Sequence, residues 1–265
     1  MLYDKVNYTA DISYLNNVFI TEYDISKCNI NVLYTKNIID KQTYDYLYNA
    51  ERMVRQVYIG KLSKNKYISD ALKEGIIEAK KIFFESNNIQ DRDVLSIKND
   101  AVYIINKRLK YTKFNLIEFK PKNVYTSFYK FRNMEIYYYY NNMNKNEYIH
   151  IKGISDEKIK LHENYFLQLL KDVFYSIQID GPEVALRMLK DFYLDYIQMN
   201  LPIEYYRKFD IYSDYHFKYK TSLNTGFAAM DMLDKDKYLL DITYNASILL
   251  QLQRYIISMY FSKNK

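Results

Sequence analysis

Two aspartates stand where a fold could bring them together. Asp24 ends a segment, residues 18–25, that alternates apolar and polar residues and is rich in β-formers, which predicts a strand. Asp100 ends the polar run Lys98-Asn99-Asp100 between two apolar runs of period two, which predicts the tip of a β-hairpin. If the two strands are neighbours in one sheet, both carboxylates can converge on divalent cations, which prefer oxygen ligands.

The alternative is that both aspartates only form turns. Asp is common in turns, and the chain has 32 acidic residues from which two could fall there. Between the two aspartates, however, residues 67–87 give the clearest helix prediction, with Ser69 as cap and an apolar stripe at helical spacing. Strand, helix and acidic hairpin in this order is the arrangement of a nucleotidyltransferase palm.

The rest of the chain predicts an α+β fold. A broken helix is expected over residues 29–49, and strands over 94–97, 102–104, 115–119, 125–131, 134–140 and 148–151. Helices follow over 159–179, 183–200 and 241–261, with a break at Gly181-Pro182 and an irregular stretch over 203–236. An antiparallel sheet with helices is therefore followed by a mostly helical region.

Composition excludes several classes of protein. Hydrophobic residues make up 49% and charged residues 26%, which is typical of a soluble globular protein and not of a disordered one. The single cysteine, Cys28, excludes an internal disulfide, and the three scattered histidines exclude a zinc site. We find no signal peptide and no apolar run of membrane-spanning length, so we expect a cytoplasmic protein with no membrane partner.

Charge and aromatic content are less specific. The net charge of +6 permits a polyanionic partner without requiring one. The 32 tyrosines reflect A/T-rich codons at least in part, a bias that suits a phage or other mobile element. In the run of tyrosines at positions 137–140, a strand would place two rings in the core and two in solvent, where they could stack on bases. We favour core packing for this run.

Several stretches resemble motifs of family B DNA polymerases, in the same order. EYDISKCNIN (residues 22–31) resembles their first palm motif, an Asp followed closely by Ser-Leu-Tyr-Pro. LSIKNDAVYII (residues 95–105) is similar to their palm hairpin motif Asp-Thr-Asp-Ser, whose second Asp matches Asp100. RMVRQVYIGK (residues 52–61) resembles the fingers motif Lys-x-x-x-Asn-Ser-x-Tyr-Gly, with Arg52, Gln56 and Gly60 in register. IKGIS (residues 151–155) and LLDITYN (residues 239–245) resemble later segments of the same family.

The resemblance implies a palm-like domain over residues 1–155, with reduced fingers over about 32–88, and a thumb-like domain over 156–265. It implies primer extension from nucleoside triphosphates, on DNA or RNA, by two Mg²⁺ (or Mn²⁺) ions that Asp24 and Asp100 hold as catalytic residues. The nucleotide-binding residues would be Arg52, Arg55, Gln56, Lys61 and Asn29, and the nucleic-acid-binding residues Lys98, Lys120, Lys122, Lys130 and Lys152. A further protein subunit is expected if the enzyme is split.

Departures from the family motifs favour a second hypothesis. Lys98 stands in place of the first Asp of the hairpin motif, and Asn29 in place of the tyrosine that excludes ribose 2′-hydroxyls. A degenerate palm that serves as a nucleic-acid-binding accessory or scaffold subunit would explain Lys98 and the short fingers. Asp24 and Asp100 favour the enzyme. A third class is an interaction protein without a nucleic-acid role, in which the basic residues only form solvated helix faces.

Overall fold

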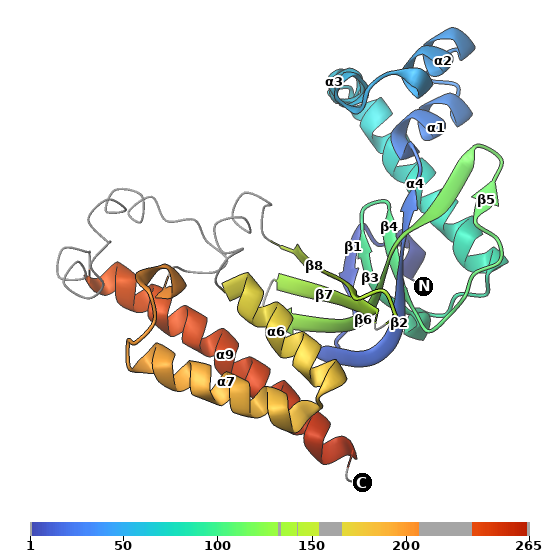
Figure 1. Cartoon of the computed structure of the whole chain (residues 1–265). Helices are drawn as coiled ribbons and strands as arrows, with labels where there is room; N and C mark the ends of the chain where they lie inside the picture. Colours follow the sequence, from blue (N-terminus) through green and yellow to red (C-terminus); the bar gives the residue numbers. More distant parts are fainter. Residues whose placement is uncertain (1, 132–133, 142, 154–165, 207–234, 264–265) are drawn as a thin grey trace. The chain divides into compact units, whose positions relative to one another are not determined.

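The computed structural model describes residues 2–131, 134–141, 143–153, 166–206 and 235–263 (Figure 1). The described strands form one antiparallel sheet of order β1-β3-β4-β2-β6-β7-β8, in which β5 pairs with β6. They are β1 (Asn7–Thr9), β2 (Tyr14–Ile25), β3 (Val94–Lys98), β4 (Ala101–Ile105), β5 (Lys113–Phe114), β6 (Ile117–Phe131), β7 (Met134–Asn141) and β8 (Asn146–Lys152). The described helices are α1 (Cys28–Thr35), α2 (Lys41–Asn49), α3 (Arg52–Leu62), α4 (Lys66–Ser86), α6 (Phe166–Ile179), α7 (Pro182–Ile197) and α9 (Lys235–Lys263). The predicted α+β class is confirmed.

The described chain divides into two compact units, each with its own core. Unit 1 comprises residues 1–12 and 18–125, and unit 2 comprises residues 13–17 and 126–265. In unit 2, the end of β6 and strands β7 and β8 share a core with α6, α7 and α9. The division therefore falls inside β6 and differs from the boundary predicted between residues 155 and 156. The assignment of palm-like and thumb-like domains stays a prediction.

The core of unit 1 lies where β2 packs on α4. Side chains alternate between the two faces of a strand, so Tyr23 and Ile25 lie in the core while Glu22 and Asp24 share the other face of β2. Phe83 of α4 contacts Tyr23 edge-on, with ring centroids 5.5 Å apart, and stacks on Phe119 of β6 at 3.9 Å. The strand that ends in Asp24 is thereby fixed by aromatic packing.

Helix α4 matches its prediction except at its start. The side chain of Asn65 accepts a hydrogen bond from the Tyr67 backbone N–H at 2.9 Å and caps the helix. Ser69, the predicted cap, lies inside the first turn. Asn and Ser cap helices equally well, so residue type alone does not distinguish the two positions.

Strand β6 corrects the prediction of two separate strands over residues 115–119 and 125–131. It is continuous through Pro121, which is exposed. Proline removes a backbone donor, but a strand tolerates it where that donor would face solvent. The predicted hairpin of β3 and β4 and the strands β7 and β8 are confirmed.

The tyrosine run in β7 differs from simple alternation. Tyr137 and Tyr138 point to opposite faces of the strand, yet both are fully buried. Tyr138 packs near Phe174 of α6, and Tyr137 packs near Phe128 of β6. Both faces of the strand are therefore covered at these two residues. Tyr139 and Tyr140 are partly exposed.

The last helices follow the prediction where they are described. Helix α6 covers the end of the predicted helix 159–179, whose first residues lie outside the described chain, and α7 begins at Pro182 as expected. Most of the predicted irregular stretch 203–236 also lies outside the described residues. Helix α9 begins at Lys235, earlier than the predicted residue 241.

Gly75 gives a first testable prediction. A Cβ atom there would clash with Cγ1 of Val32, a buried residue of α1. We expect Gly75→Ala to destabilise the fold by about 1–3 kcal/mol, because overpacking forces rotamers and backbone to shift. The measurement is chemical denaturation. Gly60→Ala is the control: beyond its own helix, no described residue lies within 4 Å of a Cβ atom at Gly60, so helix propensity should raise stability by up to about 1 kcal/mol. Equal effects of the two substitutions would contradict the close packing of α1 on α4.

Candidate functional site

The pairing of β2 with β4 brings Asp24 and Asp100 to one end of the two strands. The strands are adjacent and antiparallel, as predicted, and Asp24 lies opposite Ala101, the residue after Asp100. The Ile25 backbone N–H donates to the carbonyl of Asp100 at 3.3 Å. Asn99 and Asp100 form the two-residue turn between β3 and β4, where Asn99 takes the positive φ that such turns require. The hairpin thus places one aspartate next to the end of the strand that carries the other.

The charge of Asp24 acts on Asp100. Burial, and then the negative charge of Asp24, raise the pKa of Asp100 above its usual value, while a backbone hydrogen bond, Lys122 and Lys80 oppose the shift. Like charges close together in a partly buried place disfavour ionisation. A divalent cation between the carboxylates would relieve this cost, and Mg²⁺ commonly takes one or two carboxylates together with phosphate oxygens and water. Both groups are carboxylates, the type of donor that such a cation prefers.

Lys122 lies at the carboxylates. Its ammonium is 3.6 Å from Oδ2 of Asp24 and 4.0 Å from Oε1 of Glu22. The sequence predicts nucleic-acid binding for this residue, and its side chain is 55% exposed. An ammonium in this position partly neutralises the site, so it competes with a metal cation for Asp24.

Glu22 was not assigned a role from the sequence. It is almost fully buried and accepts hydrogen bonds from the hydroxyls of Tyr103 (3.0 Å) and Tyr125 (2.8 Å) and from Nδ2 of Asn123 (2.7 Å). Its position two residues before Asp24 on a strand was the available signal, because residues i and i+2 share a face. Neutral donors bind both carboxylate oxygens of Glu22. These hydrogen bonds hold the Glu22 side chain in place on the same face of β2 as Asp24.

A cavity adjoins Asp100 on the side of α4. It measures about 320 Å³, and its lining includes Asp100, Asn29 and Lys80. Asn29, predicted to lie where a ribose gate would stand, therefore opens onto the same space as Asp100. Lys80 is buried and donates to the carbonyl of Lys5. Burial lowers the pKa of Lys80, and the negative charges of Asp4 and Asp100 oppose that shift.

The positive charges of Arg55 and Lys120 act on Lys27, the residue before α1. Burial, followed by the positive charges of Arg55 and Lys120, lowers the pKa of Lys27. The Lys27 ammonium donates to the carbonyl of Tyr48 at 2.5 Å and lies 3.3 Å from the centre of the Tyr48 ring. Lys27 is the N-cap residue of α1, and a helix N-terminus favours anions. Lys27 was not predicted; its place between Asp24 and the helix was the signal.

The other predicted nucleotide-binding residues lie on α3 but do not share one face. Arg55 is half-buried and donates to the carbonyl of Ala50 at 2.9 Å. Arg52, Gln56 and Lys61 are exposed. At 3.6 residues per turn, Lys61 lies on a different side of the helix from Arg52 and Gln56. Of this group, Arg55 is the residue near Lys27.

The predicted nucleic-acid-binding lysines fall in both units. In unit 1, Lys98 donates to Oγ1 of Thr9 at 3.1 Å and Lys120 lies 3.4 Å from a carboxylate oxygen of Glu118. Lys130 on β6 and Lys152 on β8 belong to unit 2. Lys122 lies beside Asp24, as described above. That these lysines form one nucleic-acid-binding surface stays a prediction.

Residues 1–258 match the protein family described as "Bacteriophage PBS1 gene 130 protein". The chain belongs to this family. The match agrees with the predicted phage origin, and the family description assigns no activity. No curated protein matches the chain.

Cys28 has no catalytic features in this member of the gene 130 family. Its side chain is buried, and burial together with the charges of Asp100 and Asp24 raises the pKa of the thiol. The thiolate is therefore disfavoured, in agreement with the interpretation of Cys28 as a small buried residue.

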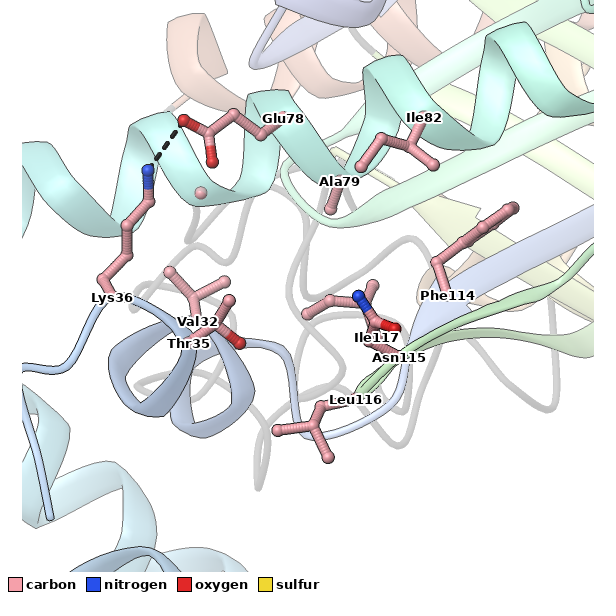
Figure 2. A pocket seen from close by; sticks show the side chains of 11 residues that line it. Val32, Thr35, Lys36, Glu78, Ala79, Ile82, Phe114, Asn115, Leu116 and Ile117 are labelled. Carbon is pink, nitrogen blue, oxygen red and sulfur yellow. Dashed lines mark hydrogen bonds and ion pairs between the residues drawn. The ribbon is translucent and has the colours of Figure 1, made fainter. Parts of the chain in front are cut away.

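A second hollow in unit 1 lies between α1, α4 and the turn that joins β5 to β6 (Figure 2). It measures about 110 Å³ and is lined largely by apolar side chains, among them Val32, Ile82 and Phe114. Lys36 and Glu78 cross one side of it as an ion pair of 2.7 Å. These two charges neutralise each other, so the hollow offers little chemistry.

Two further findings apply to the described residues alone. They contain no group of three or more His, Cys, Asp or Glu side chains placed to hold a metal ion, so any cation at Asp24 and Asp100 needs ligands from substrate or water. Within the same residues, no helix is both long enough and apolar enough to cross a bilayer.

The raised pKa of Asp100 predicts how stability depends on pH. A carboxyl whose pKa is raised by folding destabilises the fold when it is ionised. This cost disappears as the pH falls toward 3.8, the ordinary pKa of the Asp carboxyl, which applies in the unfolded chain. We expect Asp100→Asn to raise the melting temperature at pH 7, and the gain to shrink toward pH 4. The measurement is thermal denaturation in EDTA across this range.

Asp40→Asn is the matched control for this experiment. The Thr43 backbone N–H donates to the Asp40 carboxylate and lowers its pKa, so ionised Asp40 is favourable and its replacement should bring no gain at pH 7. A loss of stability in Asp100→Asn at pH 7 would contradict the electrostatic strain assigned to the aspartate pair.

Proposed function

We propose that the chain is a nucleotidyltransferase that extends a nucleic-acid primer, with Asp24 and Asp100 as the ligands of Mg²⁺ or Mn²⁺. One observation carries the proposal: the pairing of β2 with β4 sets Asp24 beside the hairpin turn that holds Asp100. The motif order resembling family B DNA polymerases supports the same reading.

The residues around the pair have consistent roles in this proposal. When bound, a divalent cation neutralises phosphate charge and activates the primer 3′-hydroxyl. Lys27 and Arg55 hold the triphosphate, whose negative charge relieves the repulsion between them. Asn29 adjoins the sugar because it lines the same cavity as Asp100. A small amide there excludes a ribose 2′-hydroxyl poorly.

Primer extension by the purified chain tests the proposal. A labelled primer on DNA or RNA templates is incubated with Mg²⁺ or Mn²⁺ and either deoxyribo- or ribonucleoside triphosphates. We expect incorporation of both sugars at rates within about tenfold of each other, which corresponds to about 1.4 kcal/mol in barrier height. Incorporation that discriminates strongly between the sugars would contradict the role given to Asn29.

One observation favours a second candidate, a nucleic-acid-binding accessory or scaffold subunit. The Lys122 ammonium lies 3.6 Å from Oδ2 of Asp24, next to the carboxylate that would bind the metal ion in an enzyme. In such a protein the ammonium substitutes for the metal and the fold keeps only its binding function. Absence of extension with every template and cation, together with retained nucleic-acid binding, would favour this candidate.

Both candidates predict binding that depends on salt. Lys and Arg side chains displace condensed counterions from phosphates. The affinity for a primer–template duplex should therefore fall by about one to several orders of magnitude between roughly 50 and 200 mM salt. Lys120 is one of the predicted nucleic-acid-binding lysines, so Lys120→Ala should reduce the slope of log affinity against log salt by about one, the loss of one phosphate contact. Fluorescence anisotropy measures both. Binding that is insensitive to salt would contradict both candidates.

A further inference from the structure

Helix α3 exposes an apolar face that has no partner among the described residues. None of its residues is fully buried. The inner side of α3 carries Tyr58, Ile59 and Leu62, which are partly buried and pack against the core of unit 1. On the opposite side, Met53 is 74% exposed and Val57 is 53% exposed. Residues i and i+4 share one face of a helix, so these two form a short apolar ridge.

Gly60 continues this ridge by one turn. Outside its own helix, no residue of the described part of the chain comes within 4 Å of a Cβ atom placed at Gly60, and the Gly60 backbone does not take a positive φ. The described fold therefore does not require glycine here, although glycine in a helix costs about 1 kcal/mol relative to alanine. A position without a side chain next to an apolar ridge lets another backbone approach closely.

The charged residues around this apolar ridge are all basic. Residues 52–66 contain five basic residues and no acidic one. Arg52, Lys61 and Lys64 are exposed, and none of them forms an ion pair within the described part of the chain. A partner for this face must therefore combine apolar groups with negative charge.

We propose that the outer face of α3 is a docking surface for an acidic amphipathic helix of a partner protein. The apolar side chains of such a helix would pack on Met53 and Val57, with its backbone near Gly60, and its carboxylates would pair with Arg52, Lys61 and Lys64. A nucleic acid fits less well, because protein surfaces that bind nucleic acid are polar and the centre of this one is apolar. Methionine is common at surfaces that accept helices because its side chain adapts its shape.

This docking surface goes beyond the proposed function, and its test is separate from primer extension. The probes are two fluorescent stapled helical peptides with the same leucine ridge at positions i, i+4 and i+7, one with glutamates along its flanks and one with lysines. We expect the glutamate peptide to bind at least tenfold more tightly than the lysine peptide. We expect the affinity of the glutamate peptide for the variant Met53→Ser/Val57→Ser to be at least tenfold lower than for the wild-type chain.

A second variant and a control make the test specific. Gly60→Leu should weaken binding of the glutamate peptide by a similar factor, because it blocks close approach without changing charge. Tyr67→Ser removes another exposed apolar side chain, 73% exposed at the start of α4, and should change affinity less than twofold. Circular dichroism confirms that each variant is folded, as expected for exposed positions.

Two results would overturn the proposal. One is equal binding of the two peptides, or binding that does not change in Met53→Ser/Val57→Ser and Gly60→Leu. The other is a single-stranded oligonucleotide that binds the wild-type chain and loses affinity in Met53→Ser/Val57→Ser as strongly as the glutamate peptide does, which would make this face a nucleic-acid surface. Neither result depends on whether the chain extends primers.

Discussion

Asp100→Asn should lower the rate of primer extension about a thousandfold while raising thermal stability at neutral pH. The substitution keeps the volume of the side chain but removes one of the two carboxylates proposed to hold the cation. A lost contribution of about 4 kcal/mol to the barrier, which is a typical size for such a site, corresponds to this factor. Stability rises because the charge that is costly beside Asp24 is gone. Opposite signs for activity and stability are the signature of a strained functional pair.

Asp45→Asn provides the control for this prediction. It makes the same chemical change at an exposed position of α2, where Asp45 forms a surface ion pair with Lys41. We expect activity within twofold of the wild type. Single-turnover extension with saturating nucleotide measures the chemical step. Activity in Asp100→Asn within tenfold of the wild type would contradict the mechanism, even if the wild-type chain is an active enzyme.

The second large effect is expected in the core beneath the site. Phe83→Ala should destabilise unit 1 by about 3–5 kcal/mol, as buried Phe-to-Ala changes typically do. The ring is fully buried, stacks on Phe119 with an interplanar angle of 5°, and contacts Tyr23, the residue before Asp24. Its loss leaves a cavity against β2 and β6 together, so the position of Asp24 should be affected as well as stability.

Ile82→Ala is the neighbour control for Phe83→Ala. Ile82 lies on the same helix and is 46% exposed, so we expect its replacement to cost about 1 kcal/mol or less. Urea denaturation followed by circular dichroism compares the two variants. Similar losses of stability in both would contradict the placement of Phe83 at the centre of this core.

Local pattern was sufficient to predict the elements that carry the aspartates. The alternation around Asp24 and the short polar turn at Asp100 each specify a structure within a few residues. The same holds for α4, whose apolar stripe is long. Prediction was wrong where residue type alone does not fix a position, as for the helix cap, which is Asn65 and not Ser69. It was also wrong in β6, where an exposed proline within a continuous strand was read as a break.

The surroundings of the aspartates could not be predicted in the same way. Lys122 and Glu22 are about one hundred residues apart in sequence and meet only through the folded sheet. The basic residues of the fingers-like segment were expected to act together, but Arg55 alone is found near Lys27, because helical geometry turns its neighbours to other sides. The burial of both Tyr137 and Tyr138 likewise depends on what covers each face of β7.

Iron-mediated backbone cleavage tests the cation site at Asp24 and Asp100 most directly. Fe²⁺ with ascorbate and peroxide generates hydroxyl radicals at the place where the ion binds, and mass spectrometry locates the cuts. We predict cuts near residues 22–29 and 98–101, suppressed by excess Mg²⁺ and absent in Asp100→Asn. Cleavage elsewhere, or the same cuts in Asp100→Asn, would contradict a divalent cation site formed by these two carboxylates.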